Sequence, residues 1–168
     1  MSLEKYWKKR KFDKTPEPKG RVLKTSKNRF VVHDHYALKA GHHHDFRLEM
    51  STSAKASVDK LASAKASAGK DVVLKSWAVP KGVPEKKGKR VLALETEPHP
   101  VSYLNFQGEI PRGCYGAGVV KIFDKGTYKL IERTENKIVF ELKGKKLKGK
   151  YTLLRFKKPN HWLLFKIE

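Results

Sequence analysis

The sequence predicts an all-β fold, a compact single-domain β-barrel that carries a basic N-terminal arm. Short β-rich stretches recur between turn signals from Arg29 onward, and no segment shows long helical periodicity. The 168 residues suffice for one domain with a real hydrophobic core. Short strands at this spacing are typical of barrels and sandwiches. We therefore expect residues 1–28 to form the arm and residues 29–168 to form the barrel.

The order of the elements follows from local signals. The first two dozen residues are basic and are interrupted by Pro16, Pro18 and Gly20, which predicts an arm with one short helical turn laid over the domain. Strands are expected at residues 30–33, 43–50, 72–79, 91–96, 118–123, 127–131, 137–142, 151–156 and 161–167. The later turns are expected at Lys125-Gly126, Lys143-Gly144 and Pro159-Asn160.

Residues 51–70 differ in composition from the strands on either side. They are rich in Ala, Ser and Lys, and the pentapeptide Ser-Ala-Lys-Ala-Ser occurs at 53–57 and again at 63–67. Such a segment can bury little apolar surface, which indicates an exposed insertion between two strands. A lysine-bearing flap that touches nucleic acid is the alternative.

The net charge indicates a polyanionic partner. The chain has 38 Lys and Arg against 17 Asp and Glu, a formal net charge of +21. Positive residues cluster at 8–11, at 86–90 and in the segment 143–158, which contains no acidic residue. This pattern predicts binding to nucleic acid, whereas a phosphodiesterase of cyclic nucleotides or other small molecules needs no such charge.

Cysteine usage and hydropathy indicate the compartment. The single cysteine, Cys114, excludes an internal disulfide and a multi-cysteine zinc site, and we interpret it as a small filler in a Gly-rich turn. Residues 1–12 lack the apolar run of a signal peptide, and no window approaches the roughly 20 apolar residues that span a membrane. We expect a cytoplasmic monomer without a membrane partner.

The richest chemical signal lies in the strand expected at 43–50. Side chains of a strand alternate between its faces, so His43, Asp45 and Arg47 project together, while Phe46 and Leu48 lie on the apolar face. Imidazole and carboxylate groups without thiolates suit Mn²⁺, Zn²⁺ or Fe²⁺. An arginine beside such a site can grip phosphate oxygens with its planar fork, which indicates phosphate ester chemistry.

A third ligand must come from another segment. His35 can return to the site across the stretch 37–41, and His33, which has the same strand parity, is the competing candidate. His99 lies between two prolines and could act as a general acid, with Tyr103 as a hydroxyl donor four residues later.

Two further cations are candidates for phosphate contacts. Lys81 stands at a tight turn before a glycine, and Arg90 opens the next expected strand. Either residue could equally be an exposed cation, so neither is diagnostic alone.

Taken together, these segments resemble the 3′-phosphoesterase domain of bacterial DNA ligase D and its free-standing archaeal relatives. The resemblance extends over most of the chain. It lies in Lys9-Arg10-Lys11-Phe12, Thr15-Pro16-Glu17-Pro18, Phe30-Val31-Val32 with His35, His43-His44-Asp45-Phe46-Arg47-Leu48-Glu49, Leu74-Lys75-Ser76-Trp77-Ala78-Val79-Pro80-Lys81-Gly82, His99-Pro100 with Tyr103, Gly108-Glu109-Ile110-Pro111, and Gly113 with Tyr115-Gly116-Ala117-Gly118.

The resemblance implies a β-barrel hydrolase with a mononuclear Mn²⁺ site, Zn²⁺ or Co²⁺ being the alternatives. Such an enzyme removes a 3′-terminal ribonucleoside as a phosphodiesterase and then the resulting 3′-phosphate as a phosphomonoesterase, in DNA break repair by non-homologous end joining. By motif position, the metal ligands would be His35, His43 and Asp45, and the scissile phosphate would be engaged by Arg47 and His99. The phosphate would be supported by Tyr103, Lys81 and Arg90. Arg10 and Glu17 would contribute mainly to the removal of the ribonucleoside.

The chain departs from the family pattern in three places. Lys11 stands where the family usually has an aspartate after the N-terminal arginine, which leaves the diesterase step open. The interval from His35 to His43 is about two residues longer than usual. The insertion at 51–70 is not part of the common pattern.

We interpret the chain as a metal-dependent 3′-end-healing phosphoesterase that acts on DNA or mixed RNA/DNA 3′ ends of a primer–template duplex. The alternative is a non-catalytic nucleic-acid-binding module that recruits a ligase or tethers ends. We expect any ligase activity to come from a separate partner in the end-joining machinery.

Overall fold

The computed structural model describes residues 3–52 and 71–168, which are almost entirely β-structure. The elements are α1 (Glu4–Lys8), β1 (Arg29–Ala37), β2 (Gly41–Ser51), β3 (Val72–Val79), β4 (Arg90–His99), η3 (Val101–Asn105), β5 (Gly108–Ile110), β6 (Gly118–Arg133), β7 (Lys137–Lys143), β8 (Lys148–Lys157) and β9 (His161–Lys166).

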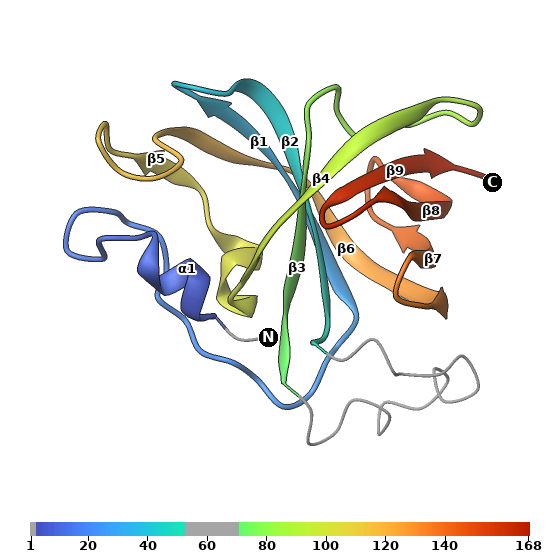
Figure 1. The fold of residues 1–168 in the computed structure, drawn as a ribbon, viewed down its shortest axis with the longest axis horizontal. Coiled ribbons are helices and arrows are strands. Elements are labelled where there is room, and N and C mark those ends of the chain that lie inside the picture. Colours follow the sequence, from blue (N-terminus) through green and yellow to red (C-terminus); the bar gives the residue numbers. More distant parts are fainter. Residues whose placement is uncertain (1–2, 53–70) are drawn as a thin grey trace.

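The strands close into a barrel. Hydrogen bonding runs in the order β1-β2-β3-β4-β9-β8-β7-β6-β5, and an additional pairing of β1 with β6 joins the two sides of the sheet. Eight antiparallel strands therefore form the barrel, and β5 is added at the edge of β6 (Figure 1). The predicted all-β barrel is confirmed.

The two faces of the strands bury different apolar clusters. Phe46 and Leu48 of β2 point into the barrel and pack in its core with Trp77 of β3 and Phe140 of β7. Alternate residues of β1 and β3 point outward, where a second cluster joins Val31, Leu74, Tyr6 of α1, and Tyr103 and Leu104 of η3. The arm and η3 therefore form a layer over the outer face of the barrel, as Figure 1 shows beside β3 and β4.

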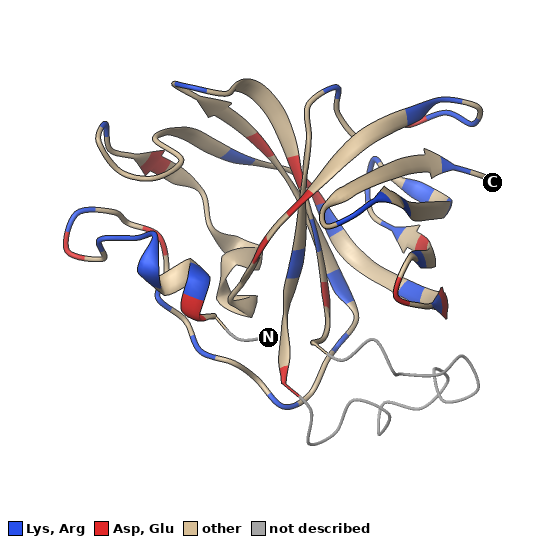
Figure 2. Cartoon of the chain, viewed as in Figure 1, with Lys and Arg blue, Asp and Glu red and all other residues tan. Residues whose placement is uncertain are grey.

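The arm is fixed to this layer. Leu3 and Tyr6 are fully buried, Trp7 Nε1 donates to the Lys19 carbonyl at 2.9 Å, and the Tyr6 hydroxyl donates to the Pro18 carbonyl. Lys and Arg residues are distributed over the arm, the strands and their connections (Figure 2). Within the described ranges, no helix is long and apolar enough to cross a membrane.

One expected turn is wrong. β6 continues through Lys125-Gly126 without a turn. A Cβ at Gly126 would lie 2.3 Å from the Lys143 carbonyl oxygen, so the glycine serves to permit a close approach of β6 to β7. The turns at Lys143-Gly144 and Pro159-Asn160 are confirmed. β4 also extends beyond the expected strand and ends at His99. Most of the expected insertion, residues 53–70, lies outside the described residues.

Candidate active site

Strand pairing brings the three predicted metal ligands together on the outer face of the barrel. His35 of β1 lies directly opposite His43 of β2, and Asp45 follows two residues later on the same face. His35 Nδ1 is 3.1 Å from Asp45 Oδ2, and His43 Nε2 is 3.1 Å from Asp45 Oδ1. The competing candidate, His33, lies instead 3.0 Å from the Phe106 carbonyl oxygen.

The hydrogen bonds of the ring nitrogens that face away from Asp45 indicate that these three residues could bind a metal ion. A carbonyl oxygen only accepts, so His35 Nε2–H donates to Gly116 at 2.8 Å and His43 Nδ1–H donates to Gly41 at 3.1 Å. The other nitrogen of each neutral ring then carries a lone pair, and that nitrogen faces Asp45. Metal-binding histidines are oriented in this way by a second hydrogen bond.

The charges around Asp45 favour a cation. Burial opposes ionisation of Asp45, but the hydrogen bonds that His35 and His43 donate when their rings are protonated, together with the charge of Arg47, hold its pKa well below the usual value. Burial likewise opposes protonation of His43, whose pKa is nevertheless raised by the hydrogen bond and charge of Asp45. An ionised carboxylate between two lone pairs attracts positive charge, whether a proton or a divalent metal.

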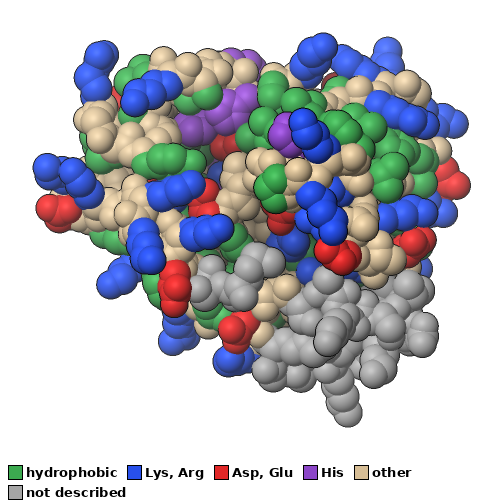
Figure 3. Space-filling model, in the orientation of Figure 1, with side chains coloured by type: hydrophobic (Ala, Val, Ile, Leu, Met, Phe, Trp, Pro, Cys, Tyr) green, Lys and Arg blue, Asp and Glu red, His purple; other side chains and the backbone are tan. Residues whose placement is uncertain are grey.

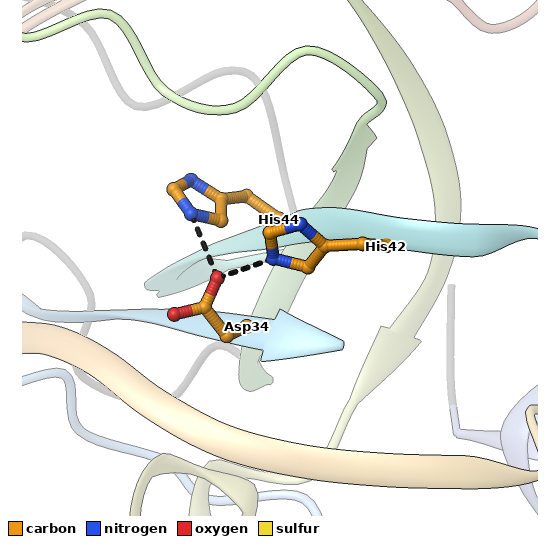
Figure 4. Close-up of side chains that lie close together, drawn as sticks. All are labelled: Asp34, His42 and His44. Carbon is orange, nitrogen blue, oxygen red and sulfur yellow. Dashed lines mark hydrogen bonds and ion pairs between the residues drawn. The ribbon is translucent and has the colours of Figure 1, made fainter. Parts of the chain in front are cut away.

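A second group of His and Asp lies on the inner face of the same hairpin (Figure 4). Asp34 Oδ1 is 2.8 Å from His42 Nε2 and 3.1 Å from His44 Nε2. In this group the second nitrogen of His44 accepts a hydrogen bond instead of donating one, because the Val83 backbone N–H donates to His44 Nδ1 at 3.0 Å. His44 Nε2 must therefore carry the proton in the neutral ring, which leaves this ring no free lone pair. We interpret this group as a hydrogen-bonded brace between β1, β2 and the turn after β3.

Arg47 lies beside the ligand group, where it contacts the Asp45 carboxylate and two neutral residues, Tyr103 and His33. Its Nη2 is 3.4 Å from Asp45 Oδ2, and its guanidinium lies 4.8 Å from the centre of the Tyr103 ring. Its Nε donates to His33 Nδ1 at 3.4 Å, and the other nitrogen of His33 faces the Phe106 carbonyl. Burial and the charge of Arg47 lower the pKa of His33 to about 3, so His33 is a neutral residue that positions Arg47.

The arm contributes a buried ion-pair network to the same site. Arg10 Nε lies 3.2 Å from Glu17 Oε2, and Arg10 Nη1 lies 2.9 Å from Glu97 Oε2. The side chains of Arg10, Glu17 and Glu97 are at most 4% exposed. The Tyr103 hydroxyl donates to Glu17 Oε2 at 2.7 Å, which commits it to the network. Glu97 was not predicted, because it lies 87 residues from Arg10 and no local signal joins the two.

His99 connects the arm to the ligand side. Its Nδ1–H donates to the Glu97 carbonyl at 2.9 Å, so Nε2 holds the lone pair and accepts from Arg10 Nη2 at 3.2 Å. Burial and the charges of Arg47 and Arg10 lower the pKa of His99 well below its usual value. His99 therefore rests neutral, and it needs a proton before it can act as the predicted general acid.

The outer ligand group, Arg47, His99, Tyr103 and the ion-pair network of the arm line one cleft of about 760 Å³, a volume suited to a ligand of nucleotide size. Its walls come from the arm, from the β1–β2 connection at 37–40 and from the loop at 110–117. On the face shown in Figure 3, histidine side chains gather near the top with Lys and Arg side chains around them.

Two predicted residues are not brought to this cleft. Lys81 and Arg90 are exposed and do not line it, and the Arg90 guanidinium lies instead 4.9 Å from the ring of Phe165. The role of these two cations in phosphate binding stays a prediction that the geometry does not support. Two groups that sequence reasoning missed are the carbonyls of Gly41 and Gly116, which carry no side-chain signal.

The chain is similar to one domain of known end-joining proteins. A family model described as the DNA Ligase D 3′-phosphoesterase domain matches residues 68–155. The Mycobacterium tuberculosis protein named "Multifunctional non-homologous end joining DNA repair protein LigD" is 34% identical over 172 residues, which cover 99% of this chain and 20% of that protein. For the LigD proteins of Mycolicibacterium smegmatis and Pseudomonas aeruginosa, the identities are 36% over 179 residues and 35% over 175 residues. Those matches cover 99% and 98% of this chain, and 20% and 18% of the respective proteins. The chain thus spans about one fifth of the length of these relatives.

Proposed function

This chain belongs to the DNA ligase D 3′-phosphoesterase domain family, and from that premise we propose that it is a metal-dependent hydrolase that heals DNA 3′ ends. The first step removes a 3′-terminal ribonucleoside, and the second removes the 3′-phosphate that remains. The proposal rests on one observation, the convergence of His35, His43, Asp45, Arg47 and His99 in a single cleft.

Both steps are hydrolysis at phosphorus. In the first, a water oxygen bonds to phosphorus while the bond to the 5′ oxygen of the ribonucleoside breaks, and that oxygen leaves with a proton. In the second, the bond to the 3′ oxygen of the DNA breaks, which releases inorganic phosphate and a 3′-hydroxyl. A DNA ligase needs that hydroxyl, so we propose that a ligase partner uses the healed end.

The ligand group and Arg47 would hold the phosphate. His35, His43 and Asp45 would bind Mn²⁺, or Zn²⁺ or Co²⁺ in its place, and the metal would stabilise negative charge on the phosphate as a Lewis acid. Arg47, already aimed at this centre, can grip two phosphate oxygens with its planar fork. Its buried position strengthens that attraction because little water screens it.

His99 would donate a proton to the leaving oxygen. The negative charge of a bound phosphate favours the protonated imidazole, which offsets the cations that now keep the ring neutral. A proton on Nε2 could then pass to the leaving oxygen, as a general acid requires. Tyr103 would act as a positioning residue, because its hydroxyl holds Glu17 and Glu17 holds Arg10.

The test uses primer–templates that end in a single ribonucleotide or in a 3′-phosphate, each incubated with and without Mn²⁺. The wild-type protein is expected to produce the 3′-phosphate and then the 3′-hydroxyl only with metal. His43→Ala is expected to lose both products, and His42→Ala, the neighbouring histidine of the other face, is the matched control. Duplex binding without product under Mn²⁺, Zn²⁺ or Co²⁺ would overturn the enzyme proposal and favour the non-catalytic module that tethers ends or recruits a ligase.

A further inference from the structure

Two large apolar side chains stand exposed at the edge of the cleft. Tyr115 is 46% exposed and Leu38 is 57% exposed, and both line the cleft. They come from two loops in contact, because the Leu38 backbone N–H donates to the Ala117 carbonyl at 2.9 Å. Exposed apolar surface beside a ligand cleft indicates that a ligand covers it.

Tyr115 lies between the ligand group and the arm. The next residue, Gly116, supplies the carbonyl that orients His35, so Tyr115 is one residue from an atom that positions a metal ligand. Lys9 Nζ lies 4.8 Å and the Arg10 guanidinium lies 5.0 Å from the centre of the Tyr115 ring. A phosphate held in this cleft by the ligand group and Arg47 would therefore have the Tyr115 ring on one wall beside it.

Building on the proposed function, we propose that Tyr115, with Leu38 beside it, forms a stacking platform for the base of the 3′-terminal ribonucleoside. Every base has a flat π-face, so an aromatic ring binds bases with little regard to their identity. The substrate of the second step has already lost that base. The platform therefore contributes to removal of the ribonucleoside and has no effect on removal of the 3′-phosphate.

The prediction is a selective defect. Tyr115→Ala is expected to lower kcat/KM for the ribonucleotide-ended substrate by roughly 5- to 150-fold, the range expected from the loss of one base–aromatic stack. Removal of a 3′-phosphate is expected to stay near the wild-type rate. Tyr115→Phe keeps the ring and should behave like the wild type on both substrates.

Two controls separate stacking from structural support. Tyr36→Ala removes a tyrosine of similar exposure, 47%, which stacks on His42 and does not line the cleft, and it should change neither reaction. A substrate that ends in a base-free ribose removes the base instead of the ring. The wild type should lose the same factor on this substrate, and Tyr115→Ala should add no further loss.

The outcomes are distinct. Equal loss on both DNA ends, with a lowered thermal melt, would show that Tyr115 braces the arm through Lys9 and Arg10, and it would overturn the platform. An unchanged rate for Tyr115→Ala on the ribonucleotide end would overturn it as well. A wild-type protein that is inactive on both ends would overturn the proposed function, and the platform would fall with it.

Discussion

The two carboxylates of the β1–β2 hairpin offer a matched test of the proposed metal centre. Asp45 and Asp34 each lie between two histidines, on opposite faces of one hairpin. Asp45→Asn is expected to abolish stoichiometric Mn²⁺ binding, and Asp34→Asn is expected to preserve it. The reason is that both rings beside Asp45 turn a lone pair toward it. In the other group, the Val83 amide donates to His44 Nδ1, so His44 Nε2 carries a proton that points toward Asp34.

The magnitudes follow from burial and from linkage. Metal at about 100 times its Kd stabilises a folded protein by about 2.7 kcal/mol, so the wild type and Asp34→Asn should gain this much and Asp45→Asn should gain nothing. Without metal, Asp34→Asn should cost about 1 kcal/mol, because the amide oxygen still accepts and the His42 side chain is 52% exposed. Asp45→Asn should cost up to about 3 kcal/mol, because it removes the charge beside Arg47, whose side chain is only 5% exposed.

The assay is calorimetric titration with Mn²⁺ together with urea unfolding, with and without the metal. The reasoning fails if Asp45→Asn binds Mn²⁺ with wild-type affinity while folded. It also fails if Asp34→Asn loses the metal as completely as Asp45→Asn does, since that would make the inner group a ligand set.

Three further predictions concern the rest of the cleft. Arg47→Lys and His99→Gln should still bind Mn²⁺ but lose roughly two orders of magnitude in turnover, because the first removes the planar fork that grips two phosphate oxygens and the second removes the proton-transfer group; titration beside single-turnover kinetics would show whether either is a ligand instead. Glu97→Gln should weaken arm docking by about 1.5 kcal/mol, the scale of one charged hydrogen bond, seen as faster hydrogen exchange in α1 and unchanged exchange in β7. Duplex binding should weaken steeply as salt rises, because Lys and Arg displace counterions; a flat response in fluorescence anisotropy would indicate a small-molecule substrate.

The strand with the candidate ligands could be predicted from the sequence because its information is local. Alternation of His43, Asp45 and Arg47 with Phe46 and Leu48 fixes two faces, and the structure buries the apolar set inside the barrel. The same rule separates the outer ligand group from its inner counterpart. Resemblance to the family supplied what alternation could not, the choice of His35 over His33, and the structure groups His35 with His43 and Asp45.

What the sequence could not provide depends on contacts between distant segments. Glu97 contacts Arg10 only because β4 passes beneath the arm, and no spacing of residues in the sequence predicts that contact. Lys81 and Arg90 could be placed near strand ends but not at the cleft, because strand order decides which end faces the site. The dipeptide Lys125-Gly126 has the composition of a turn, yet barrel closure uses its glycine for a close approach of two strands.

The arm is best understood as part of the site. It supplies Arg10 and Glu17 to the cleft and Tyr6 to the outer apolar cluster, so one segment serves both the site and the packing. Removal of residues 1–18 would take away the partners that now satisfy Glu97 and Tyr103, together with the packing of Tyr6 on the outer apolar cluster. A truncation would therefore mix loss of structure with loss of chemistry. Single substitutions such as Tyr115→Ala beside Tyr115→Phe leave residues 1–18 in place, so they can test the two proposed phosphoesterase steps separately where a truncation cannot.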